Sequence, residues 1–221
     1  MYGSSSKRDT LQADLDELAA WQDTWLLKFN IADGKCKVMH VGSQNPENIY
    51  SLDGIELPKI NSEKDLGVLV SQNWKWDQHI NTLVKKATAM TAWVLRTVVS
   101  RSPEVMLQIY KTCIRPHLEY CVQLWSPLPS HGNWALIMSI ENVQRQFTRA
   151  IDGVGLLTYK NRLKKLGLTT LLERRARGDL IETFRILSGI ADYGSSLFKL
   201  SRTGRNLISR PGDQSNFKFP F

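Results

Sequence analysis

The spacing of apolar and polar residues predicts a helix and several short strands in the first third of the chain. Residues 10–29 carry leucine and tryptophan at one-turn intervals on one face and acidic residues on the other, as an amphipathic helix does. Residues 35–41 alternate in part between apolar and polar side chains, and residues 66–70 are short and apolar, so both are expected to be strands. Between them, residues 49–57 contain Asp53-Gly54 flanked by apolar residues, which predicts a hairpin.

Beyond residue 75 the hydrophobic period is helical. Residues 76–100 and 133–152 each place aliphatic side chains on one face. A further helix is expected between them, because the Ser-Pro pair at 102–103 supplies a cap and a first helical residue. This helix should run toward Trp125, with Pro116 kinking or dividing it.

The stretch 162–180 combines leucines at helical spacing with six basic and two acidic residues. A helix of this kind can bury one face and hold a row of cations in solvent. Thr170 and Glu173 have the spacing of a capping box, which predicts a helix that begins there and reaches about Leu187.

These elements together predict an α+β fold that is mostly α. We expect an α+β segment over residues 1–75, a helical bundle over 76–155 and basic helices over 156–193. Residues 194–221 are rich in serine, arginine, glycine and proline without periodicity, which predicts a flexible tail.

The net charge of +8 is unevenly distributed along the 221 residues. Residues 1–84 hold 8 basic and 12 acidic side chains, residues 85–177 hold 15 and 5, and residues 178–221 hold 6 and 4. A basic, leucine-rich middle after a weakly acidic first third favours a polyanionic partner over a basic face kept only for solubility.

Ten cations of the middle region are therefore candidates for nucleic-acid binding. Lys85 and Arg96, eleven residues apart, fall close to one line on the expected helix 76–100. The full set is Lys85, Arg96, Arg145, Arg149, Arg162, Lys164, Lys165, Arg174, Arg175 and Arg177.

Other kinds of chemistry have weak support in the sequence. Cys113, His117 and Cys121 lie four residues apart, but no fourth zinc ligand in a short loop pair is evident, so we expect no metal site. No nucleophile motif or complete phosphate-binding glycine loop is present. An odd number of cysteines without framework spacing suits reduced thiols, which favours an intracellular location, cytoplasmic or nuclear. We expect no membrane span.

Several blocks of the chain resemble the reverse transcriptase of LINE-type, jockey-like non-LTR retrotransposons. LQADLDELAAWQDTWLLKFN followed by KCKVMHVG is similar to the region just after the family's catalytic Asp-Asp loop. YSLDGIEL and KDLGVLV resemble the strands that close the palm. YKTCIRPHLEYCVQLWSP, IENVQRQFTRAI and YKNRLKKLGLTTLLERRARGDLIETF resemble the thumb and the segment after it. The resemblance covers roughly residues 9 to 190.

The resemblance implies a small palm remnant followed by a thumb-like helical bundle. The family uses three palm aspartates and two Mg²⁺ ions for RNA-directed DNA synthesis, and the motifs that carry those aspartates lie upstream of the matched blocks. The expectation is therefore a truncated polymerase without a cofactor of its own, Mg²⁺ being implied only for the complete enzyme. Lys35 matches a family lysine that can act as a proton donor, although its spacing from Asn30 is longer than in the family.

The expected partner is RNA or an RNA–DNA duplex, bound without sequence specificity. Three alternatives stay open. The chain can be a fragment of an intact RNA-directed DNA polymerase, a helical protein-interaction module, or a relic without a selected function. The sequence does not indicate an oligomeric state.

Overall fold

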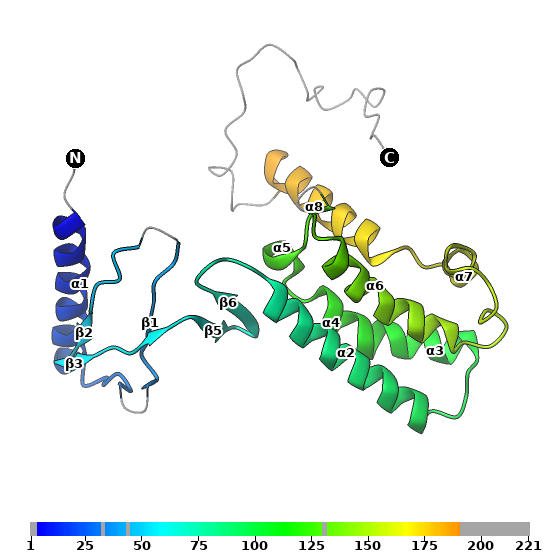
Figure 1. Cartoon of the computed structure of the whole chain (residues 1–221), viewed down its shortest axis with the longest axis horizontal. Helices are drawn as coiled ribbons and strands as arrows, with labels where there is room; N and C mark the ends of the chain where they lie inside the picture. Colours follow the sequence, from blue (N-terminus) through cyan, green and yellow to red (C-terminus); the bar gives the residue numbers. More distant parts are fainter. Residues whose placement is uncertain (1–3, 32–33, 43–44, 130–131, 191–221) are drawn as a thin grey trace, which may run out of the picture. The chain divides into compact units, whose positions relative to one another are not determined.

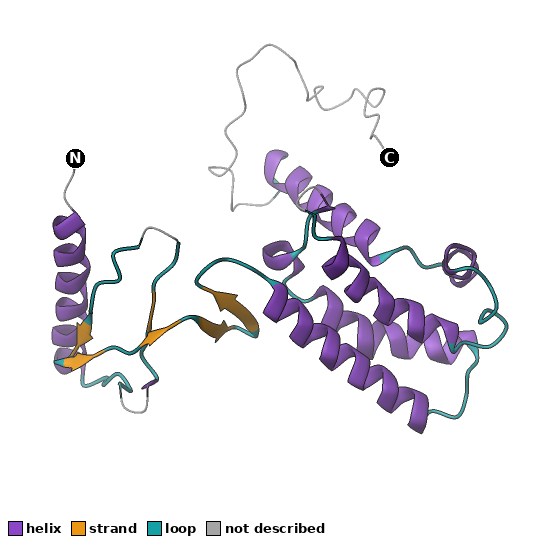
Figure 2. Cartoon of the chain, in the orientation of Figure 1, coloured by secondary structure: helices purple, strands orange, loops and turns teal. Residues whose placement is uncertain are grey.

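A computed structural model describes residues 4–31, 34–42, 45–129 and 132–190 (Figure 1). The chain divides into two units, residues 1–176 and residues 177–221. The described part is mostly helical with a few short strands, which confirms the α+β, mostly α fold class (Figure 2). The boundaries of the four segments expected from the sequence remain predictions, and the expected tail lies outside the described residues.

Helix α1, Ser4–Trp25, begins earlier and ends earlier than the hydrophobic pattern predicts. It cannot continue because Leu26 has a left-handed φ of 56°. The turn that follows is held by Gln22, which is 1% exposed and whose side-chain oxygen accepts the backbone N–H of Phe29 at 2.9 Å. The side chain of Gln22 thus accepts a backbone N–H just beyond the helix end, where no helical carbonyl is available to accept it.

Within the described residues, six short strands form three two-stranded sheets. Strand β1, Val38–Met39, pairs in parallel with β4, Lys59–Ile60. Strands β2, Ser51–Leu52, and β3, Ile55–Glu56, form the hairpin expected around Asp53-Gly54, and both turn residues have positive φ, as a type I′ turn requires. Helix α1 is joined to this hairpin through Gln12, which donates to the carbonyl of Ser51 at 3.0 Å and accepts its N–H at 3.1 Å.

The third sheet corrects one strand prediction. Strands β5, Ser62–Asp65, and β6, Val68–Ser71, are antiparallel, and Leu66-Gly67 is the turn between them. Leu66, expected inside a strand, has φ 44° and is exposed. The apolar pattern placed the start of the strand two residues too early, because Leu66 is apolar like the strand residues although it lies in the turn.

A helical bundle follows the third sheet. Its elements are α2 Asp77–Thr97, α3 Pro103–Ile109, a π-helical turn Tyr110–Ile114, α4 Arg115–Glu119, α5 Val122–Trp125, α6 Trp134–Arg149, α7 Tyr159–Leu166 and α8 Leu171–Leu187. Helix α2 packs along α6 and against α4 (Figure 1). The core includes Tyr110, Trp125 and Phe147, each exposed by 1% or less.

The helix expected from residue 103 to Trp125 is interrupted twice. The π-helical turn precedes Pro116, which lacks an N–H and crowds the carbonyl four residues earlier, so a widened turn relieves both constraints. Cys121 then adopts a left-handed conformation with φ 53°, and the short helix α5 starts after it.

The basic stretch 162–180 is two helices rather than one. Helix α7 ends at Leu166 because Gly167 takes the left-handed conformation that closes a helix, with φ 64°. Helix α8 begins with the predicted capping box: Glu173 N–H donates to Thr170 Oγ1 and Thr170 N–H donates to the Glu173 carboxylate, both at 3.1 Å. The row of cations expected on one helix is therefore divided between two.

No helix of the described residues combines the length and apolar character needed to cross a bilayer.

Candidate nucleic-acid interface

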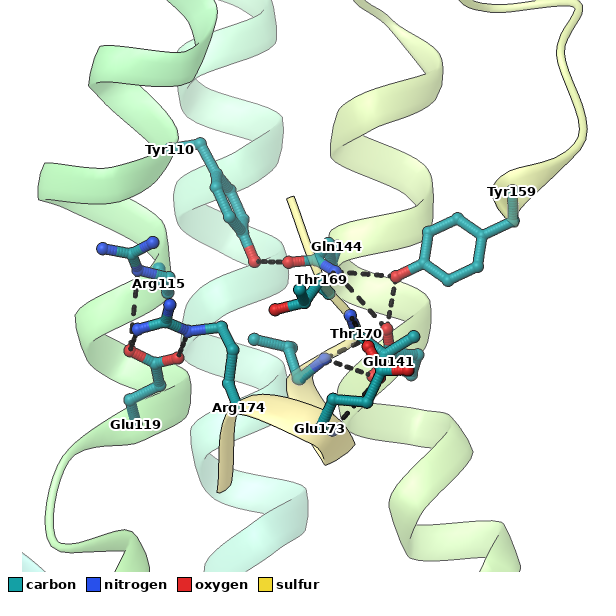
Figure 3. Close-up of polar contacts among 11 residues, drawn as sticks. Tyr110, Arg115, Glu119, Glu141, Gln144, Tyr159, Thr169, Thr170, Glu173 and Arg174 are labelled. Atoms are coloured by element: carbon teal, nitrogen blue, oxygen red, sulfur yellow. Dashed lines mark hydrogen bonds and ion pairs between the residues drawn. The ribbon is translucent and has the colours of Figure 1, made fainter. Parts of the chain in front are cut away.

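A buried polar network fixes the start of α8 against α6 (Figure 3). Glu141 on α6 is 5% exposed and accepts the backbone N–H of Leu171 at 3.0 Å and the hydroxyl of Tyr159. Gln144, fully buried, accepts the Tyr110 hydroxyl at 2.5 Å and donates to the carbonyl of Thr169 at 3.0 Å. Buried polar groups contribute to stability only when they are paired, and these pairs join α6 to α7, to α8 and to the π-helical turn.

The two tyrosines of this network remain neutral. Burial is the main reason that the pKa of Tyr110 is raised far above its usual value. Burial also raises the pKa of Tyr159, and the neighbouring Glu141 carboxylate adds to the effect. Each phenol therefore acts as a hydrogen-bond donor to α6.

An ion-pair cluster links α4 to α8. Arg174 Nε donates to Glu119 at 2.5 Å, and Arg115 Nε lies 3.5 Å from the same carboxylate (Figure 3). The bond to Glu119 is the main cause of the raised pKa of Arg174. Because its charge is already matched by Glu119, Arg174 is a weaker candidate for binding phosphate than an unpaired cation.

Arg162, a predicted binding residue, is directed inward. It is 4% exposed, and its guanidinium donates to Thr148 Oγ1 at 3.1 Å, to the carbonyl of Leu157 at 3.1 Å and to that of Arg145 at 3.2 Å. Burial is the main cause of its lowered pKa, and the charges of Arg149 and Arg145 add to it. Arg162 thus fixes the α6–α7 connection and is not displayed to solvent.

Two guanidinium groups lie over the ring of Tyr159. The carbon of the Arg145 guanidinium lies 4.7 Å from the centre of the Tyr159 ring, and that of Arg162 lies 5.6 Å from it. Arg149 is one turn beyond Arg145 on α6 and is exposed. Stacking on an aromatic face holds an arginine in place while leaving its edge free to donate hydrogen bonds.

The loop between α6 and α7 depends on glycine and is braced by cations. A Cβ on Gly155 would lie 2.8 Å from the carbonyl oxygen of Arg149, closer than side chains approach backbone. Lys165 Nζ donates to the carbonyl of Gly153 at 3.0 Å. The Oγ1 of Thr158 then caps α7 by accepting the N–H of Asn161 at 3.4 Å.

The structure brings some predicted cations together and separates others. Arg145, Arg149, Arg162, Lys164 and Lys165 all lie on α6, α7 or the turn between them. Lys85 and Arg96 are exposed on α2, whereas Arg175 is 3% exposed. Arg177 belongs to the second unit and is exposed there.

We call the exposed or half-buried cations of α6 and α7 the α6–α7 cationic surface; its members are Arg145, Arg149, Lys160, Lys164 and Lys165. Lys160, which is exposed in the first turn of α7, was not among the cations selected from the sequence. Residues 134–166, which span α6 and α7, hold six basic residues and two acidic residues, the buried Glu141 and the exposed Asp152. The charge of this segment is therefore strongly positive in the folded state.

In the described residues, the cysteines, the possible metal ligands and Lys35 do not form a common site. Cys113 and Cys121 are exposed, and all three cysteines are free. Within the described ranges, no three His, Cys, Asp or Glu side chains gather in a position to hold a metal ion. Lys35 is exposed in the segment before β1.

Comparisons with known proteins support one relationship. No family model and no solved structure matches the chain. Among curated proteins, the chain is similar to the probable RNA-directed DNA polymerase from transposon X-element of Drosophila melanogaster, with 24% identity over 149 residues. The match covers 66% of this chain but only 16% of that polymerase. This likeness supports a reverse transcriptase-like relationship for the chain.

Proposed function

We propose that this chain is the segment that follows the catalytic loop in a LINE-type, jockey-like reverse transcriptase, with its helical bundle acting as the thumb. In this proposal the bundle holds RNA or an RNA–DNA duplex by its phosphates. The observation that carries it is the α6–α7 cationic surface: residues 134–166, which span α6 and α7, hold six basic residues and two acidic residues, of which Glu141 is buried.

The chemistry of this surface suits backbone binding without sequence specificity. Neutralising phosphates releases condensed counterions, which supplies affinity for any sequence. Contacts to phosphates position a nucleic acid but do not distinguish its bases. Arg162, Lys165 and the buried network around Glu141 fix the two helices, so the exposed cations are presented in a constant arrangement.

We propose that the chain by itself does not polymerise nucleotides. In the family it resembles, three palm aspartates hold the Mg²⁺ ions, and the matched blocks lie downstream of them. The described residues do not fit such a centre, because no three potential ligands lie together. Lys35 alone can donate a proton but cannot replace the missing carboxylates, so we assign no reaction step to this chain.

Salt-dependent binding tests the first part of the proposal. We would measure the affinity of the whole chain for a fluorescent RNA–DNA duplex over a range of salt concentrations. The double variant Arg149→Gln, Lys164→Gln should lower the slope of log affinity against log salt by about 1.8 for two lost phosphate contacts.

The matched control is the double variant Lys28→Gln, Lys75→Gln, which removes two exposed charges outside α6 and α7. Its salt slope should equal that of the unmodified chain. The proposal fails if the unmodified chain does not bind the duplex at low salt, or if both double variants reduce the slope equally.

A second proposal is that the segment works within an intact RNA-directed DNA polymerase. It is favoured by the length of the X-element relative, of which the match spans only 16%. If a separately produced palm segment from the same gene is added, primer extension should appear and should depend on the α6–α7 cationic surface. Extension that is unaffected by Arg149→Gln, Lys164→Gln would contradict this role for the surface.

A further inference from the structure

A second positively charged feature lies away from α6 and α7. A cavity of about 440 Å³ opens between the β5–β6 hairpin, α2 and α4. The side chains that give it chemical character are Lys64, His79, Thr82, Lys86, His117 and Tyr120. We call this cavity the hairpin groove.

In the part of the chain that the structure describes, no ion pair neutralises the two lysines of the hairpin groove. Neither Lys64 nor Lys86 takes part in any of the ion pairs formed by the described residues. On β5, the neighbouring Glu63 is engaged by Lys37 at 2.6 Å. Two unpaired ammonium groups beside one cavity make it attractive to an anion.

His79, which also lines the groove, adds a hydrogen-bond donor. Its Nδ1 accepts the backbone N–H of Leu69 at 3.2 Å, which leaves the ring hydrogen of neutral imidazole on Nε2. Burial is the main cause of its lowered pKa, and the charge of Lys86 adds to it. His79 is therefore neutral in the folded protein near pH 7 and still able to donate.

The walls of the groove are held in place. The Tyr120 hydroxyl donates to the carbonyl of Leu66 at 2.7 Å, which ties the hairpin turn to the bundle. Lys64 and Leu69 are directly opposed across the β5–β6 pair, so both line the same side of the cavity. The His79 ring packs edge-on against Trp125, with ring centres 5.4 Å apart.

We propose that the hairpin groove binds a single phosphate group, carried by a nucleotide or by the end of a nucleic-acid strand. A phosphate has several strong acceptor oxygens and up to two negative charges, which matches two ammonium groups and an imidazole better than a carboxylate does. The cavity volume lies in the range of small-molecule sites. This inference goes beyond the proposed function, because backbone binding by the α6–α7 cationic surface does not require it.

Isothermal titration of the whole chain at low salt tests the proposal. The probes are inorganic phosphate, a deoxynucleoside 5′-monophosphate, and one oligonucleotide with either a 5′-phosphate or a 5′-hydroxyl. We expect saturable binding of the nucleotide, and the double variant Lys64→Gln, Lys86→Gln should weaken it by about tenfold or more. Lys111→Gln, which removes an exposed charge outside the groove, should bind as the unmodified chain does.

The probes also identify the source of the phosphate. A preference for the 5′-phosphorylated oligonucleotide over its hydroxyl counterpart supports a strand end, and nucleotide binding without that preference supports a free nucleotide. His117→Ala, at an exposed position, provides a second variant that should also weaken binding. Absence of saturable binding by all four probes, or equal affinities in Lys64→Gln, Lys86→Gln and Lys111→Gln, would overturn the proposal without affecting the duplex-binding test.

Discussion

At the scale of single residues, we expect the buried Glu141 to contribute more to the stability of the fold than any exposed charged residue of α6. Its carboxylate accepts the first backbone N–H of α8 and the Tyr159 hydroxyl, and Gln144 Nε2 lies 3.4 Å from it. Deleting one partner of a buried bond leaves the other partners without water or protein to pair with. The cost of such a change exceeds the net value of the bonds that are lost.

Glu141→Ala should therefore lower the free energy of unfolding by about 2–3 kcal/mol. Urea denaturation followed by circular dichroism provides the measurement. Gln146→Ala, at an exposed position on the same helix, should change the stability by less than about 0.5 kcal/mol. Similar losses in both variants would mean that the buried network does not hold α8.

Two glycines should respond to alanine in opposite directions. Gly155→Ala places a Cβ 2.8 Å from the Arg149 carbonyl oxygen and should destabilise the fold by about 1–3 kcal/mol. Gly178→Ala, within α8 and without any atom near the new Cβ, should stabilise by about 0.5–1 kcal/mol. The same denaturation experiment distinguishes them, and a loss of stability in both would show that the α6–α7 loop is not specifically constrained.

At the scale of elements, the hairpin β5–β6 is joined to the bundle by few polar bonds. One is the Leu69 N–H to His79 bond and another is the Tyr120 hydroxyl to the carbonyl of Leu66. Protonation of His79 removes the acceptor for Leu69, so this connection should depend on pH.

The pKa of His79 is lowered in the folded state, mainly by burial and also by Lys86. Its contribution to stability is therefore present above the unfolded pKa, near 6.5, and is lost as the pH falls through the folded pKa. His79→Gln keeps an acceptor for Leu69 but does not titrate. Melting curves between pH 8 and pH 5, about three units, should show a weaker fall in stability for His79→Gln than for the unmodified chain. Equal falls would show that His79 does not control the pH response.

At the scale of the whole molecule, basic and acidic side chains are distributed unequally along the chain. The segment with the largest basic excess carries the α6–α7 cationic surface, whereas the acidic residues are most numerous before residue 85. A nucleic acid should therefore be attracted to the helical bundle. The potential ligands for catalytic metal ions do not gather anywhere in the described ranges.

We accordingly expect the isolated chain to bind a primed RNA template without extending the primer. A primer-extension assay with Mg²⁺, repeated with Mn²⁺, provides the measurement, and an active reverse transcriptase on the same template provides the positive control. Incorporation of nucleotides by the purified chain would show that the proposed separation of binding from catalysis is wrong.

The sequence by itself determined the elements whose signals are local. The helix at 133–152, the Asp53-Gly54 hairpin and the capping box of Thr170 and Glu173 were predictable, because hydrophobic period, turn residues and caps act over a few positions. The resemblance to transposon reverse transcriptases was also visible from short blocks of residues. The binding role of the ten candidate cations remains a prediction.

Only the tertiary structure decided which charges face solvent. Arg162 and Lys164 are both cationic residues of one basic stretch, yet the first is buried among backbone carbonyls and the second is exposed. The tertiary structure alone also brought Glu141 to the backbone of Leu171, thirty positions away in the chain. It likewise formed the hairpin groove, whose two lysines come from a strand and a helix. Burial and pairing depend on which distant segments pack together, and a local pattern of residue types does not contain that information.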